Sequence, residues 1–243
     1  MCCFHPEVES VSKTRIFARS GNNGRQYLVY AMTKSSVKDV AMILPLPVPA
    51  NSPEDALKFI SFKEYPAFFD FLDSCFPKPK SAPEPARELP KRALAVVEVG
   101  DFEASFVPSV KDFDRLDERF RIPPTTWDAL PVKGFGFAVF KLKRGAQNVH
   151  PMAFDFPRAD PSKLFFPTIH IHDGKVHATA AFDHVLYCQT REGERLEIQD
   201  WEESPQPASQ CVLVGKTKDV VDGERHLYRR FVVGDRKNED IRV

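Results

Sequence analysis

Thr168-Ile-His-Ile-His-Asp-Gly-Lys-Val-His-Ala-Thr179 is the stretch from which we predict both a local fold and a functional site. The Asp-Gly pair at its centre is a strong β-hairpin signal, because a type I′ turn needs two residues that tolerate a positive φ. With this pair in the turn, His170 lies opposite His177. Side chains alternate between the two faces of a strand, so His170, His172 and His177 fall on the same face. We therefore expect a hairpin that gathers three imidazoles in one patch.

Three neutral imidazoles are the ligand set of an open zinc, copper or iron site, in which water or substrate takes the remaining position. Opposed residues on paired strands have Cβ atoms about 4.5–5.5 Å apart, close enough for the rings to turn toward one point. We predict a divalent or transition metal ion at His170, His172 and His177, and we expect His184 to join only if a bulge turns it to their face. Two other uses stay open. The solvated outer face of a hairpin also accepts histidines, and imidazoles serve acid–base chemistry or anion binding without a metal.

The N-terminus offers a second group of reactive side chains. Cys2, Cys3 and His5 place two thiols and an imidazole within four residues, a set that suits Cu(I) or zinc. These residues could fold over the histidine face and complete a mixed sulfur and nitrogen site. Alternatively, removal of Met1 leaves Cys2 with a free α-amine beside its thiol, as in an N-terminal nucleophile. Two free thiols on a frayed terminus are the third alternative.

The cysteine count argues against a disulfide framework, because the five cysteines are odd in number and spread along the chain. Cys75 falls in an apolar stripe with helical spacing over residues 66–76, and Cys188 falls in a predicted strand, so we expect both as buried thiols. The first residues lack the basic and apolar regions of a signal peptide, and no apolar run approaches the roughly 18 residues of a membrane span. We therefore predict a cytoplasmic protein.

Length and composition predict one globular domain. The chain has 243 residues, of which 42% are hydrophobic, and its 21 Phe and 21 Pro against 11 Gly favour an aromatic core with stiff turns. Lys and Arg together number 34, as do Asp and Glu, and this balance gives no reason to expect nucleic acid or an anionic membrane as a partner. We take residues 1–243 as a single domain with a proline-rich linker or surface loop at 77–91.

The remaining pattern is one of short strands separated by turns. β-branched and aromatic runs predict strands at 12–19, 26–33, 39–46, 93–99, 103–107, 134–143, 149–156, 164–172, 175–189, 211–216 and 226–233. Helical signals occur at 51–60, 66–76 and 109–120, and the charged residues 234–243 are expected to fray. Regular strand spacing predicts an α+β fold, mainly antiparallel β in a sandwich or barrel-like sheet, with two or three short helices.

These observations lead to one functional prediction and two alternatives. We predict a metal-binding protein, a metalloenzyme with hydrolase or oxidoreductase chemistry that acts on a small molecule or peptide. The first alternative is a metal-free amidohydrolase that uses Cys2 as its nucleophile. The second is a non-catalytic binding or scaffold module whose histidines are surface residues. The sequence contains no phosphate-cradling glycine loop, His-Glu-x-x-His or Cys-x-x-Cys pattern that would favour another chemistry.

Overall fold

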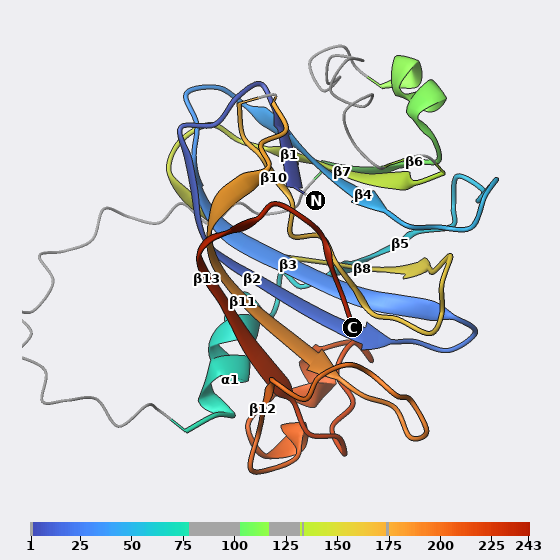
Figure 1. Cartoon of the computed structure of the whole chain (residues 1–243), viewed down its shortest axis with the longest axis vertical. Coiled ribbons are helices and arrows are strands. Elements are labelled where there is room, and N and C mark those ends of the chain that lie inside the picture. The colour runs from blue at the N-terminus through green and yellow to red at the C-terminus, as the bar shows by residue number, and fades with distance from the viewer. Residues whose placement is uncertain (1, 78–102, 117–131, 133, 174) are drawn as a thin grey trace, which may run out of the picture.

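The structure is a computed structural model that describes residues 2–77, 103–116, 132, 134–173 and 175–243. Its described strands form two large sheets and one short pair (Figure 1). The first sheet has the order β10-β1-β4-β7-β6. Its strands are β1 (Cys2–His5), β4 (Val40–Leu46), β6 (Glu103–Val107), β7 (Gly136–Leu142) and β10 (His170–Ile171). β4 is the central strand and all of its residues are buried, as its apolar sequence predicts.

The second sheet has seven strands in the order β12-β13-β11-β2-β3-β8-β5. Its strands are β2 (Ser10–Ser20), β3 (Arg25–Ser35), β5 (Lys58–Ser61), β8 (Gln147–Pro157), β11 (Thr179–Gln189), β12 (Glu202–Glu203) and β13 (Tyr228–Lys237). A short pair joins β9 (Phe165–Phe166) to β14 (Ile241–Arg242). The helices are α1 (Phe68–Ser74) and the 3₁₀ turns η1 (Val110–Arg115), η3 (Ala208–Gln210) and η4 (Val214–Lys216). None of these described helices has the length and apolarity needed to cross a membrane.

Both large sheets are mixed. β1 runs parallel to β10, and β2 runs parallel to β11, whereas the other described pairs are antiparallel. The predicted β-rich fold with few helices is therefore confirmed, but the expectation of mainly antiparallel sheets is wrong. The parallel pairs join segments that lie far apart in the sequence, and short-range hairpin signals cannot reveal such pairs.

The two large sheets share one apolar core. Met42 and Phe140 of the five-stranded sheet belong to the same buried cluster as Ile16, Phe154 and Leu186 of the seven-stranded sheet. Alternation along each strand directs these side chains to the inner faces. Figure 1 shows the five-stranded sheet lying over the longer strands of the second sheet.

Helix α1 covers the other face of the seven-stranded sheet. Its Phe68 packs edge-on against Phe17 of β2, and its Phe69 lies beside Tyr187 of β11, with ring centroids 5.8 and 5.9 Å apart. Each buried Phe contributes roughly 1.5–3 kcal/mol of stabilisation. The apolar stripe predicted over 66–76 thus forms the helix Phe68–Ser74 and attaches it to the sheet.

A disulfide joins α1 to the C-terminal part of the chain. Cys75, directly after α1, is bonded to Cys211 across a sequence separation of 136 residues, with the Cα atoms 5.4 Å apart. The prediction that Cys75 is a buried thiol is therefore wrong. The strand predicted over 211–216 is also absent, because this segment forms 3₁₀ turns that carry Cys211 to the helix. Spacing along the sequence gives no information on such a pairing.

Three other expectations differ from the structure. The helix predicted over 51–60 is a turn followed by β5. The predicted helix 109–120 is the shorter η1, with residues 117–120 outside the described part of the chain, as are residues 78–91 of the predicted linker and the predicted strand 93–99. The charged end of the chain does not fray within the described residues: β14 pairs with β9, and Val243 is buried.

Candidate functional site

The N-terminal strand lies directly beside the histidine stretch. β1 pairs in parallel with β10, so Cys2 is in register with His170. Alternation along β1 places Cys3 in a buried apolar cluster and turns Phe4 toward His172, with ring centroids 5.7 Å apart. The N-terminal segment and the histidine stretch, which the sequence suggested as neighbours, therefore pair through their backbones. The Cys3 side chain, however, points into the apolar core and not toward the histidines.

The predicted histidine hairpin does not form, because the C-terminal segment takes its hydrogen bonds. Asn238 Oδ1 accepts from the His170 N–H at 2.8 Å, and Asn238 Nδ2 donates to the carbonyl oxygens of His170 and His177 at 3.0 and 3.1 Å. Asp240 Oδ1 accepts from the two N–H groups that precede His170, both at 3.0 Å. Asn238 and Asp240 thus provide hydrogen-bond partners for backbone N–H and C=O groups of the histidine stretch, so residues 175–178 need not form the opposing strand.

Three imidazoles do come together, but they are not the three predicted. His170 Nδ1 lies 3.1 Å from His172 Nε2, and the rings of His170 and His184 have centroids 4.6 Å apart. His177 lies outside this cluster, is exposed, and places its Nε2 2.9 Å from Asp173 Oδ2. His184 takes its place because the pairing of β11 with β13 turns the side chain of His184 into the interior.

Burial keeps these imidazoles neutral. It lowers the pKa of His170 to about 3, and the neighbouring His184 and His172 act in the same direction. Burial also lowers the pKa of His172 and of His184, while Asp183 Oδ1, 3.6 Å from His184 Nδ1, opposes the shift at His184. The histidine cluster, defined as His170, His172 and His184, is therefore uncharged near neutral pH.

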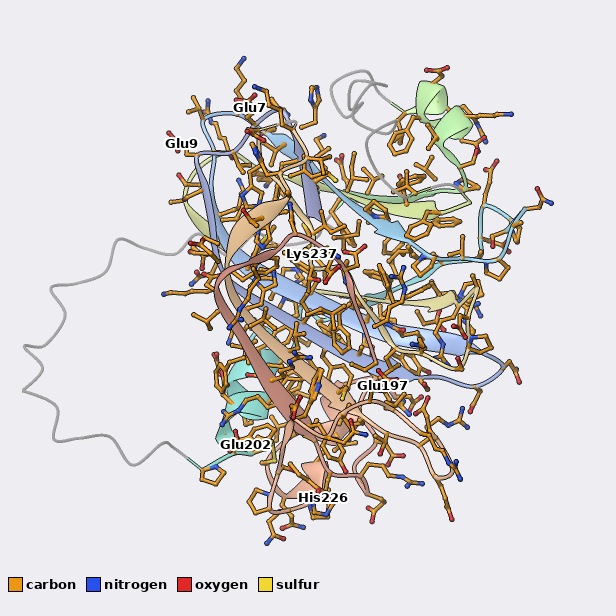
Figure 2. All side chains as sticks on the ribbon, viewed as in Figure 1. Glu7, Glu9, Glu197, Glu202, His226 and Lys237 are labelled. Carbon is orange, nitrogen blue, oxygen red and sulfur yellow. A yellow bond between two sulfur atoms is a disulfide. The ribbon has the colours of Figure 1, made fainter. Side chains whose placement is uncertain are left out.

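The predicted metalloenzyme site is wrong. Across the described residues, no group of three or more His, Cys, Asp or Glu side chains is arranged to hold a metal ion. His5 lies in register with β4 at the other end of β1, and Cys3 is buried in the core, so neither extends the histidine cluster. His226 lies at the opposite end of the molecule, 2.7 Å from the carbonyl oxygen of Ser204 (Figure 2). The catalytic role considered for Cys2 stays a prediction.

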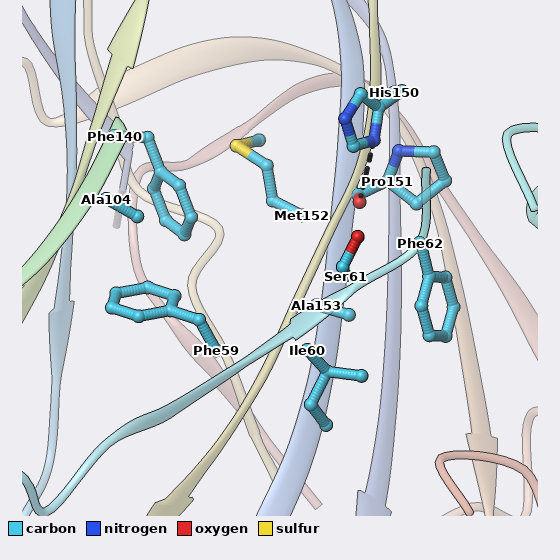
Figure 3. A pocket seen from close by; sticks show the side chains of 10 residues that line it. All are labelled: Phe59, Ile60, Ser61, Phe62, Ala104, Phe140, His150, Pro151, Met152 and Ala153. Carbon is cyan, nitrogen blue, oxygen red and sulfur yellow. Dashed lines mark hydrogen bonds between the residues drawn. The ribbon is translucent and has the colours of Figure 1, made fainter. Parts of the chain in front are cut away.

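A second candidate site lies between the outer strands of the two sheets. β5 is the last strand of the seven-stranded sheet and β6 is the last strand of the five-stranded sheet, and within the described residues each pairs on one side only. Between them is a pocket of about 190 Å³, named the edge pocket. It is lined by Phe59, Ile60, Ser61, Phe62, Ala104, Phe140, His150, Pro151, Met152 and Ala153 (Figure 3).

Aromatic rings form one wall of the edge pocket. The Phe59 ring centroid lies 5.6 Å from that of Phe140 and 6.3 Å from that of Phe154, and both contacts are edge-on. Phe59 nevertheless remains 39% exposed. Figure 3 shows Phe59, Phe140 and Ala104 around one end of the pocket. An apolar wall that stays open to solvent is a surface that a ligand can cover.

A β-bulge shapes the other end of the edge pocket. The register between β3 and β8 shifts between Tyr30 and Met32, opposite the residues His150 and Pro151. Proline has no N–H to donate to a ladder, which is why it suits a bulge. His150 Nδ1 lies 3.2 Å from the Pro151 carbonyl oxygen (Figure 3). The pairing of β5 with β8 ends just before this bulge and leaves Ser61 at the rim.

The edge pocket was not predicted from the sequence, because the signals over residues 51–60 favour a helix where the structure has a turn and β5. In a strand, Phe59 and Ser61 share one face, and this period of two was the only local signal that could have indicated β5. A strand of four residues is too short for its period to be told from that of a helix. The facing strand β6 was predicted at the observed residues 103–107, but its position opposite β5 could not be read from the sequence.

No protein-family model matches the sequence. Among solved structures, nearly the whole chain resembles one fold, and that fold is the one of baculovirus P35. Its crystal structure matches with a TM-score of 0.52 and 14% sequence identity, covering 99% of this chain and 98% of the P35 chain.

Two further P35 structures are similar to this chain. They are a mutated baculovirus P35 after caspase cleavage, with a TM-score of 0.45 and 14% identity over 98% of both chains, and the caspase-8/P35 complex, with a TM-score of 0.42 and 12% identity over 95% of both chains. At these identities the likeness shows a shared fold, and it rests on the first of the three structures. This fold, together with the absence of a metal-binding group among the described residues, argues against the predicted metalloenzyme.

Proposed function

We propose that this chain is a non-catalytic protein-binding protein that captures an extended segment of its partner at the edge pocket. The observation that carries the proposal is an apolar pocket set between two strands, each of which pairs on one side only within the described residues. A segment that adds to a sheet edge gains affinity from main-chain hydrogen bonds and specificity from pockets for its side chains. The volume of about 190 Å³ is smaller than a typical small-molecule site of roughly 300–1,000 Å³ and suits a single large apolar side chain.

The partner that we propose to test first is a protease of the caspase class. P35, which shares the fold of this chain, has been solved in complex with caspase-8, and a mutated P35 has been solved after caspase cleavage. These are properties of P35, and they support the choice of caspase-8 as the first partner for this chain. A shared fold alone does not transfer a function, so the binding has to be measured.

The test is a titration of the full chain against active caspase-8. Residual peptidase activity, complex size on gel filtration and the intact mass of the chain are measured together, and we expect a saturable complex with loss of peptidase activity. Phe59→Asp places a charge on the apolar wall and should weaken binding about tenfold or more. Leu213→Asp is the matched control, because Leu213 is 45% exposed and does not line the edge pocket.

Thermal unfolding of both variants checks that each one folds. A wild-type chain that neither binds nor inhibits caspase-8 would show that the choice of partner is wrong. If Phe59→Asp binds caspase-8 as tightly as Leu213→Asp, the edge pocket is not the binding site. Turnover of a peptide by the chain itself would overturn its assignment as non-catalytic.

A further inference from the structure

A buried ammonium group ties two turns together at one end of the five-stranded sheet. Lys34 is 1% exposed, and its Nζ donates to Ser36 Oγ at 2.8 Å, to the Gly145 carbonyl oxygen at 3.4 Å and to the Lys143 carbonyl oxygen. The Gly145 N–H donates to the Ser36 carbonyl oxygen at 2.8 Å. A buried charge is costly unless it is hydrogen-bonded, and these bonds offset that cost. They also fix the turn after β3 against the turn after β7.

The two turns border a cleft of about 690 Å³ beside the N-terminal strand, named the turn cleft. It is lined by His5, Pro6, Val37, Lys38, Asp39, Lys141 and Arg144. Val37 is 71% exposed, the highest fraction among the large apolar side chains of the described residues. The lining contains three cations and one carboxylate, and Asp39 Oδ1 already accepts the Arg144 N–H at 2.9 Å. Burial lowers the pKa of His5, which favours its uncharged, still polar imidazole.

Acidic residues near the turn cleft are already engaged or exposed to solvent. Glu103 pairs with Lys141 at 2.8 Å, with 77% of the Glu103 side chain exposed, and Glu9 accepts from Ser35 Oγ at 2.7 Å. Glu7 is exposed at the same end of the molecule as Glu9 (Figure 2). Exposed ion pairs contribute little free energy, so a better-placed carboxylate can displace them. In a chain with zero formal net charge, the lining of the cleft includes more cationic than acidic side chains.

We propose that the turn cleft binds an acidic segment of a partner protein in which an apolar residue lies among the carboxylates. Carboxylates complement the positive charges of Lys38 and Arg144, and Val37 supplies the apolar contact. Because Lys34 holds the turns in place before the partner arrives, little ordering is needed on binding. The lining contains no Phe, Tyr or Trp on which nucleic acid bases could stack, so the cleft favours a peptide.

This inference is independent of the proposed function, because the turn cleft and the edge pocket share no lining residue. Either site can therefore fail in its own test without affecting the other. The partner at the turn cleft is defined by its chemistry, an acidic segment with an apolar residue. The partner at the edge pocket is defined by an apolar side chain on an extended strand.

The test is a fluorescence anisotropy titration of the full chain with the fluorescein-labelled peptide Glu-Glu-Asp-Leu-Glu-Glu. Lys38→Glu/Arg144→Glu reverses two charges of the turn cleft, and we expect it to weaken binding about tenfold or more. Arg195→Glu/Lys216→Glu is the matched control: both side chains are exposed, lie outside the cleft, and give the same change in net charge. Val37→Ser, measured with the same peptide, reports the apolar contribution.

Two results together support the turn cleft: loss of binding in Lys38→Glu/Arg144→Glu, and wild-type binding in the control pair. Equal loss in both pairs, or no loss in either, would overturn the proposal, because net charge or another surface would then explain the data. A stronger affinity for single-stranded DNA than for the peptide would also overturn it in favour of nucleic acid. Thermal unfolding verifies that both pairs are folded, and weaker binding of the wild type at higher salt provides a readout that needs no variant.

Discussion

Single side chains of the histidine cluster give this protein a pH-dependent stability. A folded-state pKa below the ordinary 6.5 of histidine means that, as the pH falls, the unfolded chain takes up the proton first. Stability is therefore complete above pH 6.5 and is lost as the pH falls from 6.5 toward the His170 pKa of about 3. At 1.36 kcal/mol per pH unit, His170 alone lowers the unfolding free energy by about 2 kcal/mol between pH 6.5 and 5.

Urea unfolding at pH 7 and at pH 5 measures this loss. His170→Phe removes the titrating group and keeps an aromatic ring beside Phe182, so the difference between the two pH values should shrink. His177→Gln is the control: His177 is exposed and lies outside the cluster, and the variant should keep the wild-type difference. A wild-type stability that does not change between the two pH values would contradict the burial of these imidazoles.

Lys34 provides a second prediction for a single residue. Lys34→Met keeps a long side chain but leaves one buried and two part-buried oxygen acceptors without their donor, so the unfolding free energy should fall by about 1–3 kcal/mol. Lys38→Met, at the exposed position in the next turn, should change it by less than about 0.5 kcal/mol. Equal stability of the two variants in urea would show that the ammonium does not hold the turns.

Among the elements, long apolar runs were predictable and short ones were not. β2, β3 and β4 occur at the predicted positions, because each continues for several residues with a clear period or an unbroken apolar run. β5 was assigned to a helix because capping residues precede it, yet the tertiary contact with β8 decides its state. The histidine hairpin failed for a different reason. Its turn signal was real, but distant side chains compete for the same backbone groups.

Those distant side chains lead to a prediction about the C-terminal segment. Asn238→Ala removes three side-chain hydrogen bonds to His170 and His177, and at about 0.5–1.5 kcal/mol each the unfolding free energy should fall by about 2–3 kcal/mol. Amide hydrogen exchange at His170 should become faster as well. Asn22→Ala, which removes one long bond of 3.3 Å to Arg191 in an exposed loop, should change neither measurement. If the amide of His170 exchanges at the wild-type rate in Asn238→Ala, pairing with β1 alone keeps the histidine stretch in place.

For the whole molecule, the decisive contacts join distant parts of the chain. β1 meets β10, β5 of one sheet faces β6 of the other, and Cys75 bonds to Cys211. The strands and α1 could be predicted from local patterns, and the proximity of Cys2 to the histidine stretch was considered. The edge pocket could not be predicted, because each of its walls is an ordinary strand and only their meeting creates the cavity. The same holds for the disulfide, since five cysteines do not specify their own pairing.

The disulfide gives a prediction for the stability of the molecule as a whole. It closes a loop between residues 136 positions apart, so breaking it releases the unfolded chain from a long constraint, and the unfolding free energy should fall by about 2–4 kcal/mol. Urea unfolding with and without reductant measures the loss. Cys75→Ser/Cys211→Ser should be destabilised to a similar extent and should no longer respond to reductant. A wild-type stability that is unaffected by reductant would show that the bond is not formed.

Loss of the disulfide should lower the stability of the chain without changing its binding to a partner. Neither Cys75 nor Cys211 lines the edge pocket or takes part in the pairing of β5 with β8, which carries much of its wall, so we expect this pairing to persist when the disulfide is broken. The reduced chain should therefore bind caspase-8 with the affinity of the oxidised chain at temperatures where both are folded. The comparison is made without reductant, where the wild type keeps its disulfide and Cys75→Ser/Cys211→Ser has none, against caspase-8 from which the reductant has been removed. Weaker binding by the serine variant would place the binding surface on the α1 side, where the disulfide lies, instead of at the edge pocket.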